Sequence, residues 1–330
     1  MPRQYRFMFF SAIVGLVTLL AFLAVTNVTP GIAQTAGTPA ATTSAAEGDP
    51  ARGKYLVQIA GCDMCHGAPS LAVNGVVPLA GGREFKLGQL GTFYSFNLTT
   101  LQNWSTTDFD RAIRQGLQPR ANRVLAPFMP YAIYHFMSDS DVASIGAYLR
   151  SLTPVKNDIP PAQIGPGLAN LKPLPAASIP SPKADDSADT GRYLVEAVAN
   201  CGLCHTSRDS GGVIKGREYS GGRRNYGTQD TPIYPPAILG SVLSAEGYSP
   251  ENFAATLRLG IRPRGAPLNP AMPWHRYMNM TDTDLAAVWN FLQTRKLDSP
   301  WPVQTPPPPP TAAATQQSSA AGTPASTAAQ

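Results

Sequence analysis

Apolar side chains recur at helical spacing in the first half of the sequence, and a polar capping residue precedes each such segment. Asp49–Pro50 predicts a helix that runs into Cys62, because aspartate caps helix N-termini and proline suits the first turn. Residues 105–108 (STTD) predict a second helix with a box-like cap, and Gly116 ends it. Ser138 starts a third helix, whose apolar positions are Val142, Ile145, Leu149 and Leu152.

The second half of the sequence shows the same pattern. Ser249–Pro250 predicts a helix that ends at Gly260, and a later helix has the apolar positions Leu285, Val288 and Leu292. Few runs alternate between apolar and polar residues as strands do. We therefore expect an all-α protein with long loops.

The two halves correspond because short motifs recur in one order. Residues 53–57 (GKYLV) match 191–195 (GRYLV), with one extra residue before the next motif in the second copy, and residues 109–116 match 253–260. Four further matches follow: Ala80–Arg83 with Ser220–Arg223, Pro119–Arg120 with Pro263–Arg264, Met129–Pro130 with Met272–Pro273, and Ser138–Asp141 with Thr281–Asp284. The chain is interpreted as two copies of one unit.

Composition indicates where these units begin and end. Proline, alanine and serine dominate the stretch between them, which is typical of a linker that is extended where proline is frequent. The Pro/Ala/Thr-rich tail has the composition of a disordered segment. The expected segments are a signal peptide or membrane anchor at 1–33, a flexible spacer at 34–47, a first domain at 48–153, the linker at 154–187, a second domain at 188–298 and the tail at 299–330.

The N-terminus has the pattern of an export segment. Arg3 and Arg6 precede an uncharged apolar run from Phe7 to Val25, and no further charge follows until Glu47. Residues 31–33 (GIA) offer a small-x-small cleavage site, but the run is long enough to favour an uncleaved anchor in the inner membrane. The arginines stay on the cytoplasmic side, so we expect the rest of the chain on the periplasmic face.

Each unit contains one Cys-x-x-Cys-His motif, and together the two motifs use all four cysteines of the chain: Cys62, Cys65 and His66, then Cys201, Cys204 and His205. In this motif the thiols add to the vinyl groups of a haem, and the histidine takes an axial position on the iron. A zinc site needs a second ligand pair nearby in sequence, and neither half supplies one. A redox dithiol does not need the histidine that follows the second cysteine. The motifs therefore predict two covalently attached haem c groups.

The charge of the chain does not indicate nucleic-acid binding. The formal net charge is +5, and only 14% of residues are charged. The propionates of two haems would nearly cancel that excess, and no lysine or arginine run tracks a phosphate backbone. We expect no nucleic-acid partner.

The second axial position decides whether a haem carries electrons or binds a substrate. Met129 and Met272 lie in register on proline-stiffened loops, where a fixed backbone reduces the entropy of holding one sulfur in place. A methionine near aromatic residues is otherwise a core filler. The shared position favours ligation of iron, with histidine on the other side.

Other methionines, the remaining histidines and several arginines have weaker interpretations. Met137 and Met280 directly precede helix caps and are interpreted as core, whereas His135 and His275 do not match each other and are interpreted as surface or supporting residues. Pro78 is a candidate for the carbonyl that orients His66. Eight arginines fit either solvated surface or contacts with haem propionates or an acidic partner: Arg83, Arg114, Arg120, Arg123, Arg223, Arg258, Arg262 and Arg264.

The stretch from Asn97 through Phe109 to Gly116, followed by residues 128–131 (FMPY) and 138–141 (SDSD), resembles the cytochrome c domains of membrane-bound alcohol and gluconate dehydrogenases. The resemblance covers roughly residues 48–153 and 187–297. Those subunits typically carry three haem motifs and this chain has two, so it also looks like the dihaem subunit of certain haem–copper oxidases or a free-standing carrier. The resemblance implies two tandem class I-like cytochrome c domains, each wrapped around one covalent haem. The implied haem residues are Cys62, Cys65, His66 and Met129, then Cys201, Cys204, His205 and Met272.

The expected function is single-electron transfer through two His/Met haems, with no bond in a substrate made or broken. The resemblance implies a membrane or periplasmic dehydrogenase as donor and an oxidase or another cytochrome as acceptor. The alternative is an enzyme similar to dihaem cytochrome c peroxidases. That reading requires one haem to open, with His135 or His275 at the labile position.

Overall fold

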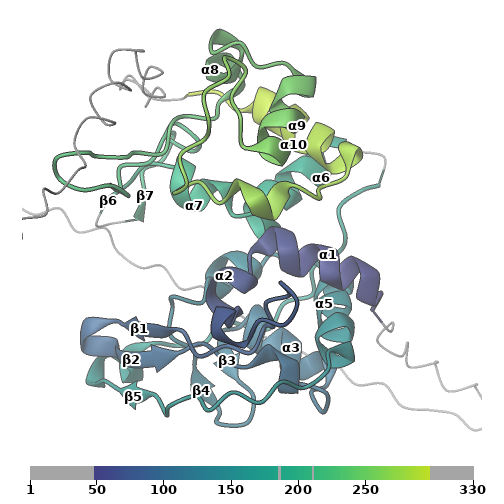
Figure 1. Cartoon of the computed structure of the whole chain (residues 1–330), viewed down its shortest axis with the longest axis vertical. Helices are drawn as coiled ribbons and strands as arrows, with labels where there is room; N and C mark the ends of the chain where they lie inside the picture. The colour runs from purple at the N-terminus through teal and green to yellow at the C-terminus, as the bar shows by residue number, and fades with distance from the viewer. Residues whose placement is uncertain (1–47, 185–186, 210–211, 298–330) are drawn as a thin grey trace, which may run out of the picture. The chain divides into compact units, whose positions relative to one another are not determined.

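Three helices occur in the same order in each half of the described chain (Figure 1). The computed structural model describes residues 48–184, 187–209 and 212–297. We call residues 48–184 the first half and residues 187–297, without 210 and 211, the second half. The corresponding helices are α1 (Pro50–Ala60), α3 (Thr106–Ile113) and α5 (Asp139–Ser151), then α6 (Ser187–Tyr193), α9 (Pro250–Leu259) and α10 (Asp282–Thr294).

The helix pairs α1–α5 and α6–α10 form the main contacts of their halves. The remaining helical elements are short: α2 (Asp63–His66), η1 (Pro69–Leu71), η2 (Gly88–Leu90), η3 (Leu98–Thr100), α4 (Tyr131–Tyr134), η4 (Pro166–Asn170), η5 (Leu194–Val198), α7 (Cys201–His205), α8 (Gly240–Ala245) and η6 (Trp274–Tyr277). Helices and loops thus dominate the described residues, and this is compatible with a cytochrome c helical fold.

The helix starts that the sequence predicts are confirmed. Asp49 accepts a bond from the backbone of Ala51, and Ser105 and Ser249 both form capping boxes. Ser138 and Thr281 cap α5 and α10 through their side-chain oxygens. These caps satisfy backbone N–H groups that a helix otherwise leaves without partners.

Two predicted helix ends are wrong by a few residues. α1 stops at Ala60 rather than reaching Cys62, because Gly61 turns the chain at φ +74°. α3 ends at Ile113, and Gly116 lies beyond it. The predicted end at Gly260 is confirmed, since that glycine caps α9 at φ +69°.

The extra residue of the second copy is absorbed without changing the backbone at the cysteine motif. α6 continues into η5, a π-helical turn that accommodates one additional residue. Asn200 then adopts φ +61°, close to the +74° of Gly61 at the equivalent position. The insertion therefore lies in the helix, and both halves enter their motif in the same left-handed conformation.

The strands are short and antiparallel. A three-stranded sheet has the order β1-β2-β5, with β1 (Glu84–Lys86), β2 (Gly91–Tyr94) and β5 (Gln163–Ile164). Two antiparallel strand pairs complete the described strands: β3 (Leu117–Gln118) with β4 (Arg123–Val124), and β6 (Arg208–Asp209) with β7 (Gly212–Val213).

The proline-rich stretch after residue 153 packs against residues 48–153. It contributes β5 to the sheet, buries Leu168, and accepts a backbone bond from Asp139 at Ile179. Leu174 donates to the carbonyl of Gln115 over 2.9 Å. The segment is mostly irregular, as its prolines indicate, but hydrogen bonds connect it to residues 48–153 at several points.

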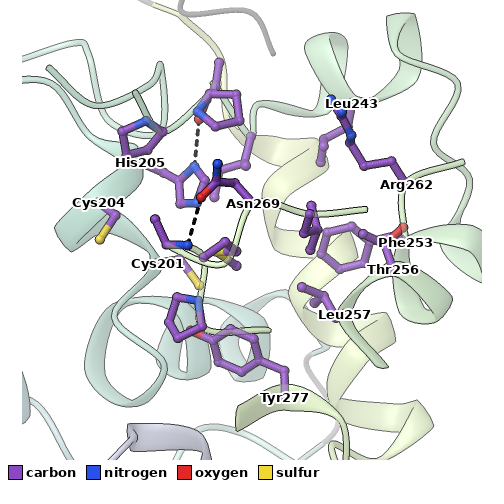
Figure 2. A pocket seen from close by; sticks show the side chains of 18 of the residues that line it. Cys201, Cys204, His205, Leu243, Phe253, Thr256, Leu257, Arg262, Asn269 and Tyr277 are labelled. Carbon is purple, nitrogen blue, oxygen red and sulfur yellow. Dashed lines mark hydrogen bonds between the residues drawn. The ribbon is translucent and has the colours of Figure 1, made fainter. Parts of the chain in front are cut away.

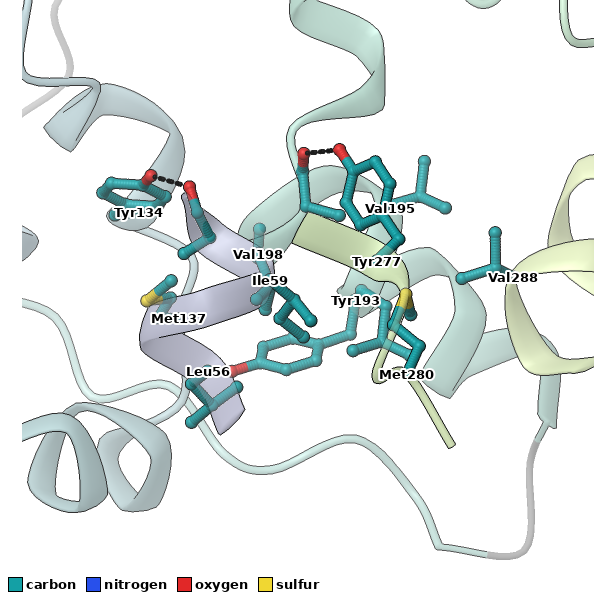
Figure 3. Close-up of a cluster of buried hydrophobic side chains, with 14 of the residues drawn as sticks. Leu56, Ile59, Tyr134, Met137, Tyr193, Val195, Val198, Tyr277, Met280 and Val288 are labelled. Atoms are coloured by element: carbon teal, nitrogen blue, oxygen red, sulfur yellow. Dashed lines mark hydrogen bonds between the residues drawn. The ribbon is translucent and has the colours of Figure 1, made fainter. Parts of the chain in front are cut away.

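One hydrophobic cluster spans both halves, and all described residues belong to one compact unit. Leu56 and Ile59 of α1 lie in the cluster with Tyr193 and Val198 of the second half (Figure 3). The core methionines Met137 and Met280 are 1% and 3% exposed, which confirms their predicted role. The predicted apolar helix positions are likewise buried, apart from the half-buried Leu152.

The contact between the halves is reciprocal. Tyr55 of the first half donates to the carboxylate of Asp284, and Tyr193 of the second half donates to that of Asp141 over 2.7 Å. Each hydroxyl also accepts a bond from a cap backbone N–H: Thr281 for Tyr55, and Ser138 for Tyr193. Matching residues thus exchange matching bonds, as in a two-fold interface.

The predicted export segment and spacer, residues 1–47, lie outside the described residues, and so do residues 298–330. Within the part of the chain that is described, no helix combines the length and apolar character needed to cross a bilayer.

Candidate functional site

Both motif histidines are held in the same way. His66 and His205 are buried, at 9% and 7% exposure, near the end of a short helix that carries their cysteines. Nδ1 of His66 lies 2.8 Å from the carbonyl oxygen of Phe96, and Nδ1 of His205 lies 2.7 Å from that of Pro236 (Figure 2). A carbonyl can only accept, so Nδ1 carries the proton and Nε2 keeps its lone pair for a metal.

The carbonyl that orients His66 is therefore Phe96 and not Pro78. The Pro78 carbonyl instead accepts a bond from Ala68 over 2.9 Å and closes the loop after α2. The sequence did carry a signal, because Phe96 and Pro236 follow their histidines by nearly the same interval, 30 and 31 residues. The spacing alone does not identify the residue, because any residue type can supply a backbone carbonyl.

The protonation of the site suits haem attachment better than redox dithiol chemistry. Burial lowers the pKa of His66 and of His205, so both rings are neutral near pH 7. Burial also raises the pKa of the Cys62 thiol to about 12 and that of Cys201 to about 11. The pKa of Cys65 is raised as well, so burial disfavours the thiolate at these three cysteines, and redox dithiol chemistry uses a stabilised thiolate.

A large apolar cavity adjoins the second motif. Its volume is about 610 Å³, which is within the range of cofactor sites. Cys201, Cys204 and His205 lie on one side of it, and Met272 also lines it. The other walls come mainly from apolar side chains, among them Leu243, Phe253, Leu257 and Tyr277 (Figure 2).

The two methionine loops have the same backbone bonding. Met129 donates to Ala126 over 3.0 Å, and Met272 donates to Asn269 over 2.9 Å. Each methionine carbonyl then accepts from the residue two positions on. Both methionines are half-buried and pack against the hydrophobic cluster, as Cys62 and Cys201 do.

A glycine and an aromatic ring anchor each of these loops. Tyr131 follows the first methionine and lies on Gly116, where an added Cβ would come within 2.5 Å of the ring. Trp274 lies on Gly260 in the same way, at 2.4 Å. Both glycines also have positive φ, so any other residue would be strained and would displace the ring.

Comparison with known proteins identifies the family. No family model matches this sequence. A dihaem cytochrome c-type protein of Cereibacter sphaeroides is 30% identical over 207 residues, which are 58% of this chain and 69% of that protein. This chain belongs to the dihaem c-type cytochromes.

Subunits of several dehydrogenases are also similar to this cytochrome. The gluconate 2-dehydrogenase cytochrome c subunit of Pantoea cypripedii is 34% identical over 175 residues, and the alcohol dehydrogenase (quinone) cytochrome c subunit of Gluconobacter oxydans is 30% identical over 187. The matches cover 48% and 52% of this chain. They span only 38% of each subunit's length.

Neither remaining histidine of the cytochrome lines the cavity beside His205. His135 lies with Nδ1 3.1 Å from the carbonyl oxygen of Arg114, and its ring is half-buried. His275 is exposed and does not line the cavity beside His205. Both positions agree with the interpretation as surface or supporting residues.

Two of the candidate propionate arginines are structural. Arg114 is buried and binds the carboxylates of Asp110 and Asp139, and Arg258 binds Asp282 over 2.7 Å. Both also donate to the carbonyl of the core methionine before the next helix. These contacts join α3 to α5 and α9 to α10, a structural role that the sequence did not indicate, and the propionate or docking role stays a prediction.

The other arginines divide by position. Arg120, Arg223 and Arg264 are exposed, as the solvated-surface reading expects. Arg83 donates to the carbonyl of Met64 over 2.6 Å. Two arginines remain candidates for a haem carboxylate: Arg262, which lines the cavity, and Arg123, whose buried Nε has no partner among the described residues.

The residues fit a haem in size and chemistry. The cavity is apolar and large, two thiols and a neutral imidazole lie at its edge, and a thioether lines it. The orphaned Nε of Arg123 offers a donor for an acidic group in the first half. A bound haem c would supply an iron that changes between ferric and ferrous states.

Proposed function

We propose that this cytochrome transfers single electrons through two haem c groups, one in each of two tandem class I-like domains at residues 48–153 and 188–298. Cys62 and Cys65 hold the first haem, and Cys201 and Cys204 hold the second. His66 with Met129 and His205 with Met272 are the proposed axial ligands.

The observation that carries the proposal is the composition of one cavity. His205 presents Nε2 because Nδ1 is occupied by Pro236, and Met272 lines the same cavity on an anchored loop. A histidine and a thioether that close both axial positions leave no site for a substrate. Ligation by sulfur also favours ferrous iron and raises the reduction potential.

The peroxidase alternative has less support. It needs a histidine at a labile axial position, but neither His135 nor His275 lines the cavity beside His205, whereas Met272 does. We therefore assign no catalytic step to this chain.

The partners are proposed from the relatives. Proteins similar to this chain are named as subunits of gluconate and alcohol dehydrogenases, so a dehydrogenase is the proposed electron donor. An oxidase or another cytochrome is the proposed acceptor. The pattern of residues 1–33 favours export and attachment to the inner membrane, which places this exchange on the periplasmic face.

The test is a measurement of covalent haem and of its ligands in the purified full chain. We expect two haems that survive acid–acetone extraction, and a methionine-to-iron charge-transfer band in the oxidised spectrum. Met129→Ala and Met272→Ala should each remove about half of that band. Extractable haem, or a band that both variants leave intact, would overturn the proposal.

A further inference from the structure

A buried cation lies between the two cysteine motifs. Arg276 belongs to η6 of the second half and is only 8% exposed. Its Nη2 donates to the carbonyl of Ile59 over 2.6 Å and to that of Ala199 over 3.1 Å. Its Nε also donates to Ile59, over 3.2 Å.

These carbonyls belong to the segments that lead into the haem-attachment motifs. Ile59 lies in the last turn of α1, shortly before Cys62, and Ala199 lies shortly before Cys201. Nη1 of Arg276 is also 3.6 Å from Sδ of Met64, between the first two cysteines. One guanidinium thus joins both attachment segments through backbone.

The surroundings leave the charge of Arg276 in place. A guanidinium does not lose its proton in proteins. Among residues 48–297, as far as they are described, no carboxylate lies within ion-pair distance of Arg276. Its partners are carbonyl dipoles and a thioether, which satisfy the donors without cancelling the charge.

Only one half supplies this cation. The residue that corresponds to Arg276 in the first half is Ile133, which lines a small pocket with second-half residues that include Glu196 and Asn200. The tyrosines that follow are equivalent, because Tyr134 donates to Ala60 over 2.9 Å and Tyr277 donates to Ala199 over 3.0 Å. The tyrosine contacts are therefore equivalent in the two halves, and the cation is not.

The first half makes room for that charge. Gly61 has no side chain, and a Cβ there would lie 2.8 Å from Cζ of Arg276. The guanidinium consequently sits directly against the turn that precedes Cys62. The guanidinium packs into the space that the missing side chain of Gly61 leaves.

We propose that Arg276 is a positioning residue that sets the reduction potentials of both haems from one shared site. The inference rests on the proposed function and deepens it. Reduction adds one electron to each haem, and a fixed positive charge in a poorly solvated region stabilises the added electron. Arg276 favours the ferrous state on both sides, and it ties the two attachment segments together.

The experiment is a spectroelectrochemical titration of the full chain with four sequences: wild type, Arg276→Gln, Arg276→Lys and Arg264→Gln. The glutamine variant keeps a donor and loses the charge, so we expect the equilibrium constant for reduction to fall at least tenfold for one or both haems. That change corresponds to about 59 mV for a one-electron couple. The lysine variant keeps the charge, so its potentials should stay within threefold of wild type.

Arg264→Gln is the matched control, because it removes an equal charge from the same half at an exposed position. Its effect should be less than threefold and should fade with added salt. If Arg276→Gln does not incorporate haem, Arg276→Met replaces it and keeps the aliphatic stem. Wild-type potentials in a folded, charge-deleted variant would overturn the inference, and so would an equal fall in Arg276→Lys.

Haem content and the methionine-to-iron band are recorded on the same samples. Failure of the proposed function would appear in the wild type, as missing haem or an open iron. Failure of the Arg276 inference would appear in a protein with two closed haems, either as unchanged potentials in the charge-deleted variant or as an equal fall in Arg276→Lys.

Discussion

The two halves of this cytochrome share the contacts that hold the histidine ring, the turn before the first cysteine and the methionine loop, and they differ at Arg276 and in the helix that leads to the motif. In both halves a backbone carbonyl holds the histidine ring, a tyrosine holds the turn before the first cysteine, and a glycine seats the ring after the methionine. At the interface, Ile133 corresponds to Arg276, and α6 continues into a π-helical turn that has no counterpart in α1. The comparison separates the features needed to hold a haem from those that make the halves unequal.

The largest expected effect is loss of one haem at a time. Cys62→Ala with Cys65→Ala should remove the first covalent haem, and Cys201→Ala with Cys204→Ala should remove the second. Each double variant should contain half the wild-type haem, as measured by the pyridine haemochrome spectrum. Retention of both haems in either double variant would break the proposed equivalence of the halves.

The methionines provide the next test. Met129→Ala and Met272→Ala should each open one iron and lower its potential, because a strong soft ligand is replaced by water or nothing. We expect at least a tenfold fall in the equilibrium constant for reduction of one haem per variant. Met137→Leu and Met280→Leu change core methionines and are the controls, which should leave both reduction potentials unchanged. A redox titration curve that is unchanged in both alanine variants would contradict the ligand assignment.

The reciprocal tyrosines test the interface. Tyr193 is 6% exposed and bonds the carboxylate of Asp141, so Tyr193→Phe should cost roughly 1.5–3 kcal/mol of unfolding free energy, the usual contribution of a bond to a charged group. Tyr55 is only half-buried, and Tyr55→Phe should cost less. Denaturant unfolding of both variants gives the comparison, and a larger loss in Tyr55→Phe would contradict it.

The smallest expected effect is a difference in acid sensitivity. Burial alone would raise the pKa of Asp139, but bonds from Ile179, Ser178 and Arg114 outweigh it and lower the pKa. The pKa of Asp139 is lower in the folded protein than in the unfolded chain, where it is near 4. The ionised carboxylate therefore stabilises the fold at pH values above the unfolded pKa, and this stabilisation is lost as the pH falls through the folded pKa. Asp139→Asn should flatten that loss when stability is measured from pH 7 down to pH 3.

Asp282 is the matched position in the second half. Its side chain is 89% exposed, against 49% for Asp139, so solvent screens its ion pair with Arg258. Asp282→Asn should therefore cost less unfolding free energy at pH 7 than Asp139→Asn does. The reverse order would show that the linker contacts of Asp139 do not stabilise the first half.

Local signals in the sequence predicted local structure well. Asp49, Ser105 and Ser138 start their helices because a capping oxygen acts within one turn and needs no distant partner. The cysteine motifs and the registered methionines gave the cavity-lining residues that the structure brings together in the second half. Periodicity also gave the core positions of α5 and α10.

Contacts between segments far apart in the chain could not be predicted from the sequence. The Phe96 and Pro236 carbonyls carry no side-chain signature, and the structural role of Arg114 was evident only once Asp139 lay beside it. The matching of Tyr55 with Tyr193 was visible in the repeat. The repeat did not reveal the hydrogen-bond partners of these tyrosines, because each hydroxyl bonds an aspartate of the opposite half.

The most direct test of the central claim is the absorption spectrum of the reduced full chain before and after carbon monoxide. Two irons closed by histidine and methionine should give no change in either half. A shift equivalent to one haem would show that one half holds an open or labile iron. The halves would then not share a single function, and peroxide turnover would be the assay to follow.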